Sequence, residues 1–261
     1  MKTPFVLAQI SDCHLLHDSD GRHCGANVLQ NLAHVLNDIE QNVKPDCIVF
    51  TGDLTQDHSE TSYQHFADAI KQSKISAPVY YLAGNHDEPA LLTHYLSGSR
   101  FNADKVFTHD LWQIILLNSK SKTPSGYISK KTLHWLHNII DPTKFQIIMM
   151  HHHPIDVGYF IDKHGLINKD EFWQNVARHE TIKAIACGHV HQGRTLLFEK
   201  ALNPMPVYTC PATSIQFDPQ SETVSCNGQG PGFRLFTLKP NGEIKSRLRF
   251  CNNELTKEEN A

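Results

Sequence analysis

The sequence lacks any apolar run approaching the roughly 18 residues that a membrane-spanning helix requires. Its first apolar run, residues 5–10, is also too short for the hydrophobic part of a secretory signal followed by a cleavage site. We therefore expect a cytoplasmic protein. With 40% hydrophobic and 20% charged residues, the 261-residue chain has a globular composition and can bury a sizeable core.

Strong charge of one sign is also missing, because the net charge of −3 gives no general attraction to nucleic acid. The seven cysteines are scattered without a Cys-x-x-Cys pair, which argues against a disulfide framework and against a thiolate zinc site. Glycine is scarce relative to histidine, with 14 glycines against 18 histidines, although glycine is normally among the commonest residues. The surplus of histidine directs attention to imidazole as a functional group.

Apolar runs alternate with helical spacings through most of the chain. The apolar runs predict buried strands at residues 5–10, 47–50, 79–82, 112–117, 145–150 and 182–187. Between them, apolar residues recur at helical spacing within residues 29–43, 63–70, 133–140 and 172–176. This rhythm predicts βαβ units and a largely parallel sheet.

From residue 195 the pattern changes to short apolar runs separated by proline, glycine and asparagine, with no room for long helices. We interpret them as antiparallel strands of a second sheet, at residues 195–199, 205–209, 213–217, 232–238 and 244–250. We expect one domain over residues 1–251, followed by a charged tail, residues 252–261, that frays.

Five of the expected strands end in residues that can ligate metals. These ends are Asp12-Cys13-His14, Gly52-Asp53, Gly84-Asn85-His86-Asp87, His151-His152-His153-Pro154 and Gly188-His189-Val190-His191. Any one of them alone is explained as well by a turn, a helix cap or an exposed strand, but five in order at strand ends are not. In an extended segment residues two apart point the same way, so Asp12 and His14 can face one cavity. His189 and His191 can do the same.

Carboxylate and imidazole without thiolate suit manganese, iron or zinc. A single ion rarely needs more than six ligands, so a larger set points to two ions that share a bridging group. The candidate ligands are Asp12, His14, Asp53, Asn85, His152, His189 and His191.

The order of these blocks resembles the calcineurin-like metallophosphoesterases. The resemblance implies an α/β fold, a four-layer α-β-β-α sandwich of two mixed sheets flanked by helices. It also implies two divalent ions, Fe2+ or Mn2+ ahead of Zn2+. Asp12, His14, Asp53 and His191 would hold one ion, and Asp53, Asn85, His152 and His189 would hold the other, with Asp53 as the bridge.

Within the triple histidine we choose His152, because the family's ligand lies two residues before a proline, here Pro154. His151 is then expected to point to the opposite face, and His153 to lie outside the direct ligand set.

A narrower resemblance covers nearly the whole chain. Residues 51–57, 63–66, 187–192, 214–217 and 230–234 look like the bacterial class III 3',5'-cyclic-AMP phosphodiesterases. This implies hydrolysis of cyclic AMP to 5'-AMP, with His86 as the catalytic proton donor. The residues expected to contact the substrate are His14, Asn85, His86 and His191.

Supporting roles are left open by the sequence. Asp87 either orients His86 or caps the following helix. Gln216 and Phe217 offer an amide and a ring to adenine, although a phenylalanine in a strand is more often part of the core.

Other functions fit the same sequence. A glycerophosphodiesterase, or a broad phosphodiesterase or phosphomonoesterase, can use the same fold. A non-catalytic metal-binding scaffold is an alternative of another class, and a nuclease is disfavoured by the charge. We expect a small cyclic nucleotide as the partner, no nucleic acid and no membrane, and we leave the choice between monomer and homodimer open.

Overall fold

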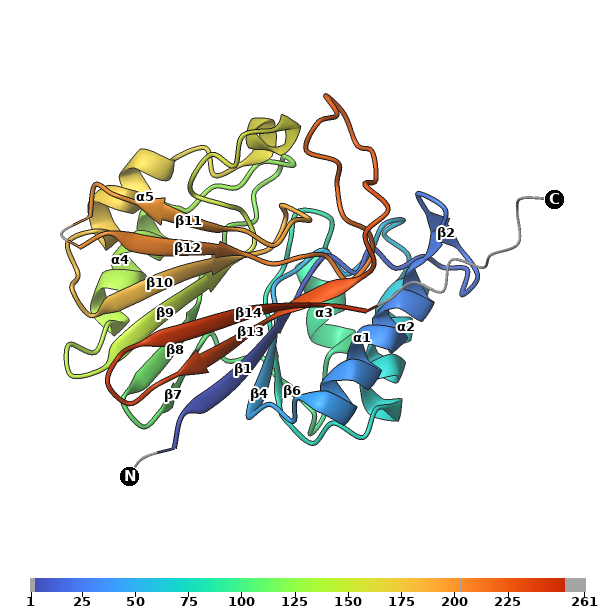
Figure 1. Ribbon diagram of the computed structural model, residues 1–261, viewed down its shortest axis with the longest axis horizontal. Helices are drawn as coiled ribbons and strands as arrows, with labels where there is room; N and C mark the ends of the chain where they lie inside the picture. Colours follow the sequence, from blue (N-terminus) through green and yellow to red (C-terminus); the bar gives the residue numbers. More distant parts are fainter. Residues whose placement is uncertain (1–2, 202, 252–261) are drawn as a thin grey trace.

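The computed structural model describes residues 3–201 and 203–251 (Figure 1). The tail that was expected to fray, residues 252–261, lies outside the described residues. Within the described ranges, no helix is both long and apolar enough to cross a membrane. The cytoplasmic location stays a prediction.

Two six-stranded mixed sheets form the centre of the fold. The first has the strand order β14-β13-β1-β4-β5-β6 and the second has the order β11-β12-β10-β9-β8-β7. The first sheet comprises β1 (Phe5–Ile10), β4 (Cys47–Phe50), β5 (Val79–Tyr81), β6 (Phe101–Asn102), β13 (Gly232–Leu238) and β14 (Ile244–Phe250). The second comprises β7 (Val106–His109), β8 (Trp112–Leu116), β9 (Phe145–Met150), β10 (Ile182–Cys187), β11 (Thr195–Phe198) and β12 (Met205–Thr209).

Helices cover the outer face of each sheet (Figure 1). The helices are α1 (Val28–Asn42), α2 (Glu60–Gln72), α3 (Pro89–Tyr95), α4 (Lys130–Ile139), α5 (Lys169–Val176) and the 3-10 helix η1 (Phe160–His164). The short strands β2 (Arg22–His23) and β3 (Ala26–Asn27) form a separate hairpin. Three of the helices begin at a side chain that accepts the backbone N–H three residues later: Asn27 for α1, Ser59 for α2 and Ser129 for α4.

The central strands are buried on both faces, which explains their continuous apolar runs. In β1, Leu7 packs in the core between the two sheets, whereas Ile10 packs under α1 and α2. In β9, Met149 faces the other sheet, whereas Met150 packs against α4 and α5. Three buried layers of side chains therefore separate four layers of secondary structure, as the resemblance implies.

The expectation that the late strands form a sheet of their own is wrong. β13 and β14 extend the first sheet, because β13 pairs antiparallel with the free edge of β1. β12 instead pairs parallel with β10 in the second sheet, and β11 then pairs antiparallel with β12. Residues 213–217 form no strand, apart from an isolated bridge between Phe217 and Cys226. β12 and β13 thus each pair at an edge that earlier strands had left open, and β11 and β14 extend the two sheets beyond them.

An ion pair joins the helical layer to the edge strand β14. Both carboxylate oxygens of Asp38 in α1 accept hydrogen bonds from Arg249, at 2.7 Å each. The hydrogen bonds from Arg249 hold the pKa of Asp38 below its usual value. Because the folded pKa is depressed, the stabilisation is present above the unfolded pKa and is lost as the pH falls through the folded pKa.

We predict that Asp38→Asn lowers the free energy of unfolding by about 1 kcal/mol at neutral pH, since the pair is bidentate but partly exposed. The difference from the unmodified protein should shrink toward zero in acid. Urea denaturation across a pH series measures both effects. Asp20→Asn, at an exposed position in a loop, is the control. A difference that persists in acid would show that the side-chain geometry, rather than its charge, stabilises the fold.

Candidate metal centre

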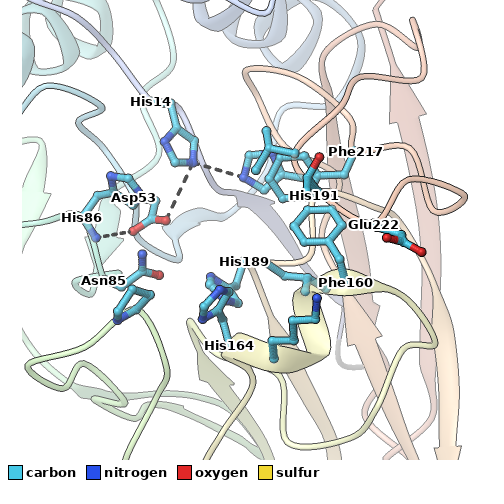
Figure 2. Close-up of a pocket in the computed structure, with 15 residues that line it drawn as sticks. His14, Asp53, Asn85, His86, Phe160, His164, His189, His191, Phe217 and Glu222 are labelled. Atoms are coloured by element: carbon cyan, nitrogen blue, oxygen red, sulfur yellow. Dashed lines mark hydrogen bonds and ion pairs between the residues drawn. The ribbon is translucent and has the colours of Figure 1, made fainter.

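All the predicted site residues follow the carboxyl ends of five parallel strands. Asp12 and His14 follow β1, Asp53 follows β4, and Asn85 and His86 follow β5. The triple histidine follows β9, and His189 and His191 follow β10. Figure 2 shows residues from both sheets pointing into one cavity of about 430 Å³. The site therefore lies where the two sheets meet at one end of the sandwich.

The backbone after β1, β4 and β10 is not extended, although the sequence argument assumed extended segments for Asp12 and His14 and for His189 and His191. Nine non-glycine residues in the described ranges have a positive φ, and five of them are predicted ligands. Their φ values lie between 46° and 66°, in the left-handed region that costs side-chain-bearing residues roughly 1 kcal/mol or more. The five are Asp12, His14, Asp53, His189 and His191. Sharp turns, rather than strand alternation, direct these side chains into the cavity.

Two glycines let the loops from neighbouring strands touch. Gly52 has a φ of +95°, and a Cβ there would lie 2.3 Å from the backbone nitrogen of Gly84. A Cβ at Gly84 would lie 2.2 Å from a carboxylate oxygen of Asp53. Any larger residue at either position would push apart the loops that present Asp53 and Asn85.

His14 and His191 face each other through atoms that carry lone pairs. The Nδ1 of His14 donates to Gln56 Oε1 at 2.7 Å, and the Nδ1 of His191 donates to the carbonyl of Ile215 at 2.8 Å. The two Nε2 atoms lie only 3.1 Å apart, and the Nε2 of a neutral imidazole whose Nδ1 donates carries a lone pair. Burial, with the neighbouring His191, lowers the pKa of His14 to about 3, so this ring is neutral. Lone pairs so close together repel unless a cation lies near both.

Two carboxylates supply negative charge at the same place. Asp12 Oδ1 lies 3.5 Å from His191 Nε2, and Asp53 Oδ2 lies 3.7 Å from His14 Nε2. Burial opposes their ionisation, but neighbouring histidines keep the pKa of Asp12 below its usual value and that of Asp53 well below. Asp12, His14 and His191 have ligand atoms within 4.8 Å of one another. This chemistry fits a divalent cation.

A second group of acceptors converges on the other side of Asp53. His151 donates through Nδ1 to the carbonyl of Thr51 at 2.7 Å. Its Nε2 lies 3.0 Å from Asn85 Oδ1 and 3.3 Å from Asp53 Oδ2. Although burial opposes protonation, Asp53 raises the pKa of His151 to about 9. A proton or a metal ion at this point would satisfy the same three atoms.

His152 points elsewhere. Its Nδ1 lies 2.8 Å from Ser119 Oγ and its Nε2 lies 3.1 Å from the carbonyl of Pro124, both in the segment between β8 and α4. It does lie near His151 and His189, with ligand atoms of the three within 4.8 Å of one another. Both its nitrogens nevertheless have protein partners, so the contacts favour His151 over His152. We propose His151 as the ligand from this segment.

The expectation that His151 points to the opposite face is wrong, and the alternation of β9 explains why. Met149 faces the other sheet and Met150 faces α4 and α5. Residue 151 shares the side of Met149, and residue 152 shares the side of Met150. The count back from Pro154 and the phase of the strand therefore favour different histidines, and the contacts agree with the phase of the strand.

His189 has a nitrogen without a partner. Its Nε2 is buried and has no hydrogen bond, and such an orphaned atom is costly unless a ligand occupies the space. Burial and the neighbouring His152 and His151 hold the pKa of His189 well below its usual value, so the ring is neutral. The backbone N–H of His189 donates to Asp12 at 3.0 Å, which ties the end of β10 to the end of β1. The free lone pair suits a metal ion.

Asp87 has neither of the roles that the sequence left open. Its buried carboxylate accepts three backbone N–H groups, from Asp53 at 2.8 Å, Leu54 at 2.7 Å and Gly84 at 2.8 Å. Helix α3 has Glu88 at its N-cap and no side-chain cap. Burial and the nearby Asp53 raise the pKa of Asp87 to about 6. Asp87 therefore clamps the loop that carries Asp53 to the loop that carries Asn85.

His86 lies beside the acceptor atoms with one nitrogen free. Its backbone N–H donates to Asp53 Oδ1 at 2.8 Å, and its ring meets His14 edge-on at 4.9 Å. The ring stacks on His58, with centroids 5.8 Å apart, and its Nδ1 is buried without a partner. Burial lowers the pKa of His86. The residues expected to contact substrate, His14, Asn85, His86 and His191, all line the cavity.

The family model and the related sequences that match this chain both describe phosphoesterases. Residues 5–193 match the family model described as calcineurin-like phosphoesterase. A relative from Colwellia psychrerythraea, named as a probable cyclic nucleotide phosphodiesterase, is 52% identical over 248 residues, which cover 94% of each chain. The 3',5'-cyclic adenosine monophosphate phosphodiesterase CpdA of Escherichia coli strain K12 is 32% identical, over 93% of this chain and 88% of its own.

Among solved structures, a dimetal phosphatase from Danio rerio superposes with a TM-score of 0.67 at 14% identity, over 96% of this chain and 100% of its own. At that identity the likeness shows the fold alone. It agrees with the two mixed sheets and flanking helices, so the predicted fold class is confirmed.

We predict that His151→Ala reduces the amount of metal retained after gel filtration, because it removes an acceptor that faces Asn85 and Asp53. His152→Ala should retain metal as the unmodified protein does. Elemental analysis by mass spectrometry measures both variants, with the exposed His134→Ala as the control. Loss of metal from His152→Ala but not from His151→Ala would restore the assignment made from the sequence.

Proposed function

This chain belongs to the calcineurin-like phosphoesterase family, and on that basis we propose that it hydrolyses 3',5'-cyclic AMP to 5'-AMP with two divalent metal ions. The observation that carries the proposal is the set of buried acceptor atoms around Asp53, which lines a cavity together with His86. Relatives that align over more than nine-tenths of the chain and carry cyclic-nucleotide phosphodiesterase names support the choice of substrate.

The residues divide into two ligand sets that share Asp53. Asp12, His14, Asp53 and His191 would hold one ion, and Asp53, Asn85, His151 and His189 would hold the other. When bound, two divalent ions supply positive charge to a phosphodiester and make water acidic enough to act as a nucleophile near neutral pH. Fe2+ and Mn2+ are our first candidates, and Zn2+ is the next.

The chain itself supplies the proton for the leaving group. The departing 3'-oxygen of the ribose is a strong base and needs a proton as its bond to phosphorus breaks. His86 lines the cavity next to Asn85, and its Nδ1 is free of protein partners. The stacked His58, whose Nδ1 lies 2.9 Å from the carbonyl of His86, keeps the imidazole in place. In the proposal His86 donates this proton as the imidazolium and becomes a neutral imidazole, and the low pKa that burial gives the ring makes the imidazolium a stronger acid.

A substrate panel tests the function. The purified protein is stripped with a chelator and reloaded with Fe2+, Mn2+ or Zn2+. We expect kcat/KM for cyclic AMP to exceed that for glycerophosphocholine, bis(p-nitrophenyl) phosphate and p-nitrophenyl phosphate by at least about tenfold. The stripped protein should be inactive. A preference for glycerophosphocholine would instead indicate a glycerophosphodiesterase, and metal binding without hydrolysis of any ester would indicate a scaffold.

We predict that His86→Ala lowers kcat for cyclic AMP by about 10²- to 10⁴-fold while metal content stays near normal. The loss should be much smaller with bis(p-nitrophenyl) phosphate, because nitrophenolate leaves without needing a proton. His134→Ala serves as the control. Equal losses on both substrates would exclude His86 as the proton donor, and a loss of bound metal would make it a ligand.

A further inference from the structure

The cavity has two ends of different chemistry. One end holds the acceptor atoms and His86, and it is sufficient for a phosphodiester. The other end is mainly apolar and is built by η1 and by the segment that runs from residue 217 to residue 224. In Figure 2, Phe160 and Phe217 lie on the side of His191, away from His86. The proposed reaction does not use the residues at this second end.

We propose that the apolar end, built around Phe160, is a subsite that binds the nucleobase of the substrate by stacking. The inference rests on the proposed function, since it takes the phosphate to lie among the acceptor atoms. The apolar residues that line this end are Phe160, Ile161, Phe217 and Val224.

Phe160 is held in place by residues on both sides of it. The hydroxyl of Tyr159 donates to the carbonyl of Val190, which belongs to the turn after β10. The carboxylate of Asp162 accepts the N–H groups of Val157 and Gly158 at 2.8 Å each, and it lies 3.2 Å from His153 Nε2. Tyr159 is itself buried, whereas Phe160 is only partly buried. These contacts fix the backbone that carries Phe160, so a ligand that stacks on the ring does not have to order this segment.

Phe217 is part of the subsite, but one face of its ring is already stacked on His191. Its ring lies parallel to that of His191, with centroids 3.9 Å apart and an interplanar angle of 3°. It also meets Phe160 at 5.2 Å and 55°. Only 6% of Phe217 is exposed, so it offers a base much less surface than Phe160 does. Val224, which is 54% exposed, adds an apolar side chain from a separate loop.

The amide that the sequence suggested for base recognition is not available at this end. Gln216, which the sequence suggested as an amide partner for adenine, is buried and its amide is used within the protein. Its Nε2 donates to the carbonyl of Ala212 at 2.7 Å, and its Oε1 accepts from the N–H of Ala212 at 3.1 Å. Of the polar side chains that line this end, Lys163, Glu222 and Thr223 lie at the exposed rim, and His164 is partly buried. Stacking tolerates any base, because every base has a π-face. The subsite should therefore accept adenine and guanine about equally.

Calorimetric titration of the metal-loaded protein with 5'-AMP and with ribose 5-phosphate tests the subsite, because the two ligands differ only by the base. We expect 5'-AMP to bind the unmodified protein about tenfold more tightly or better. Phe160→Ala should remove most of this advantage, and Phe160→Tyr should keep it. 5'-GMP should bind within a few-fold of 5'-AMP. For cyclic AMP, Phe160→Ala should raise KM far more than it lowers kcat.

Two controls show whether the change in affinity comes from the Phe160 ring itself. Tyr127→Ala truncates an exposed aromatic residue outside the cavity, and it should leave the ratio of the two affinities as it is in the unmodified protein. Thermal denaturation shows whether Phe160→Ala is folded. Should that variant be unfolded, Phe160→Leu replaces it, since it keeps bulk and removes the aromatic face.

Three results would overturn the proposal: no advantage of 5'-AMP in the unmodified protein, equal weakening of both ligands in Phe160→Ala, or retention of the advantage in that variant. Failure of the proposed function gives a different result. A protein that hydrolyses no cyclic nucleotide, yet binds 5'-AMP through Phe160, would keep the subsite and lose the proposed reaction.

Discussion

Mutual repulsion among buried acceptor atoms is the constraint on which the rest of this structure depends. His14 and His191 bring two Nε2 atoms within 3.1 Å of each other, whereas on the other side of Asp53 the raised pKa of His151 lets its Nε2 donate to Asn85 and Asp53. Buried acceptors that face one another are unfavourable without positive charge between them. Left-handed backbone at five of the candidate ligands adds to this cost, and the surrounding structure has to offset both.

The two-sheet architecture is what makes such a cluster attainable. β1, β4 and β5 in one sheet and β9 and β10 in the other all deliver their carboxyl ends to one place. The sequence predicted this, since these strands are buried on both faces and are therefore continuous apolar runs. It did not predict where the late strands pair. β12 has the same kind of run as β13, and only the open edges of the assembled sheets decide that one joins β10 and the other joins β1.

The choice between His151 and His152 as a candidate ligand shows what strand phase adds to a sequence argument. Counting from Pro154 selected His152, whereas the inward direction of Met149 carries over to His151. The role of Asp87, in contrast, could not be predicted from the sequence. Its three bonds go to backbone groups of Asp53, Leu54 and Gly84, and a backbone partner leaves no trace in the sequence. Side chains that hold loops together are therefore hard to predict, even when the residues they position are recognised.

His191 connects the two ends of the cavity through its contacts with Ile215 and Phe217. Its Nδ1 is fixed by the carbonyl of Ile215, and one face of its ring is covered by Phe217, which also contacts Phe160. The segment 215–217 thus orients an imidazole at the metal centre and supports the apolar wall at the same time. Because both tasks fall on one short segment, the contacts of Ile215 and Phe217 fix the spacing between the His191 ring and the Phe217 part of the apolar wall. A ligand with a charged end and a flat apolar end would meet a cavity whose two ends are already spaced.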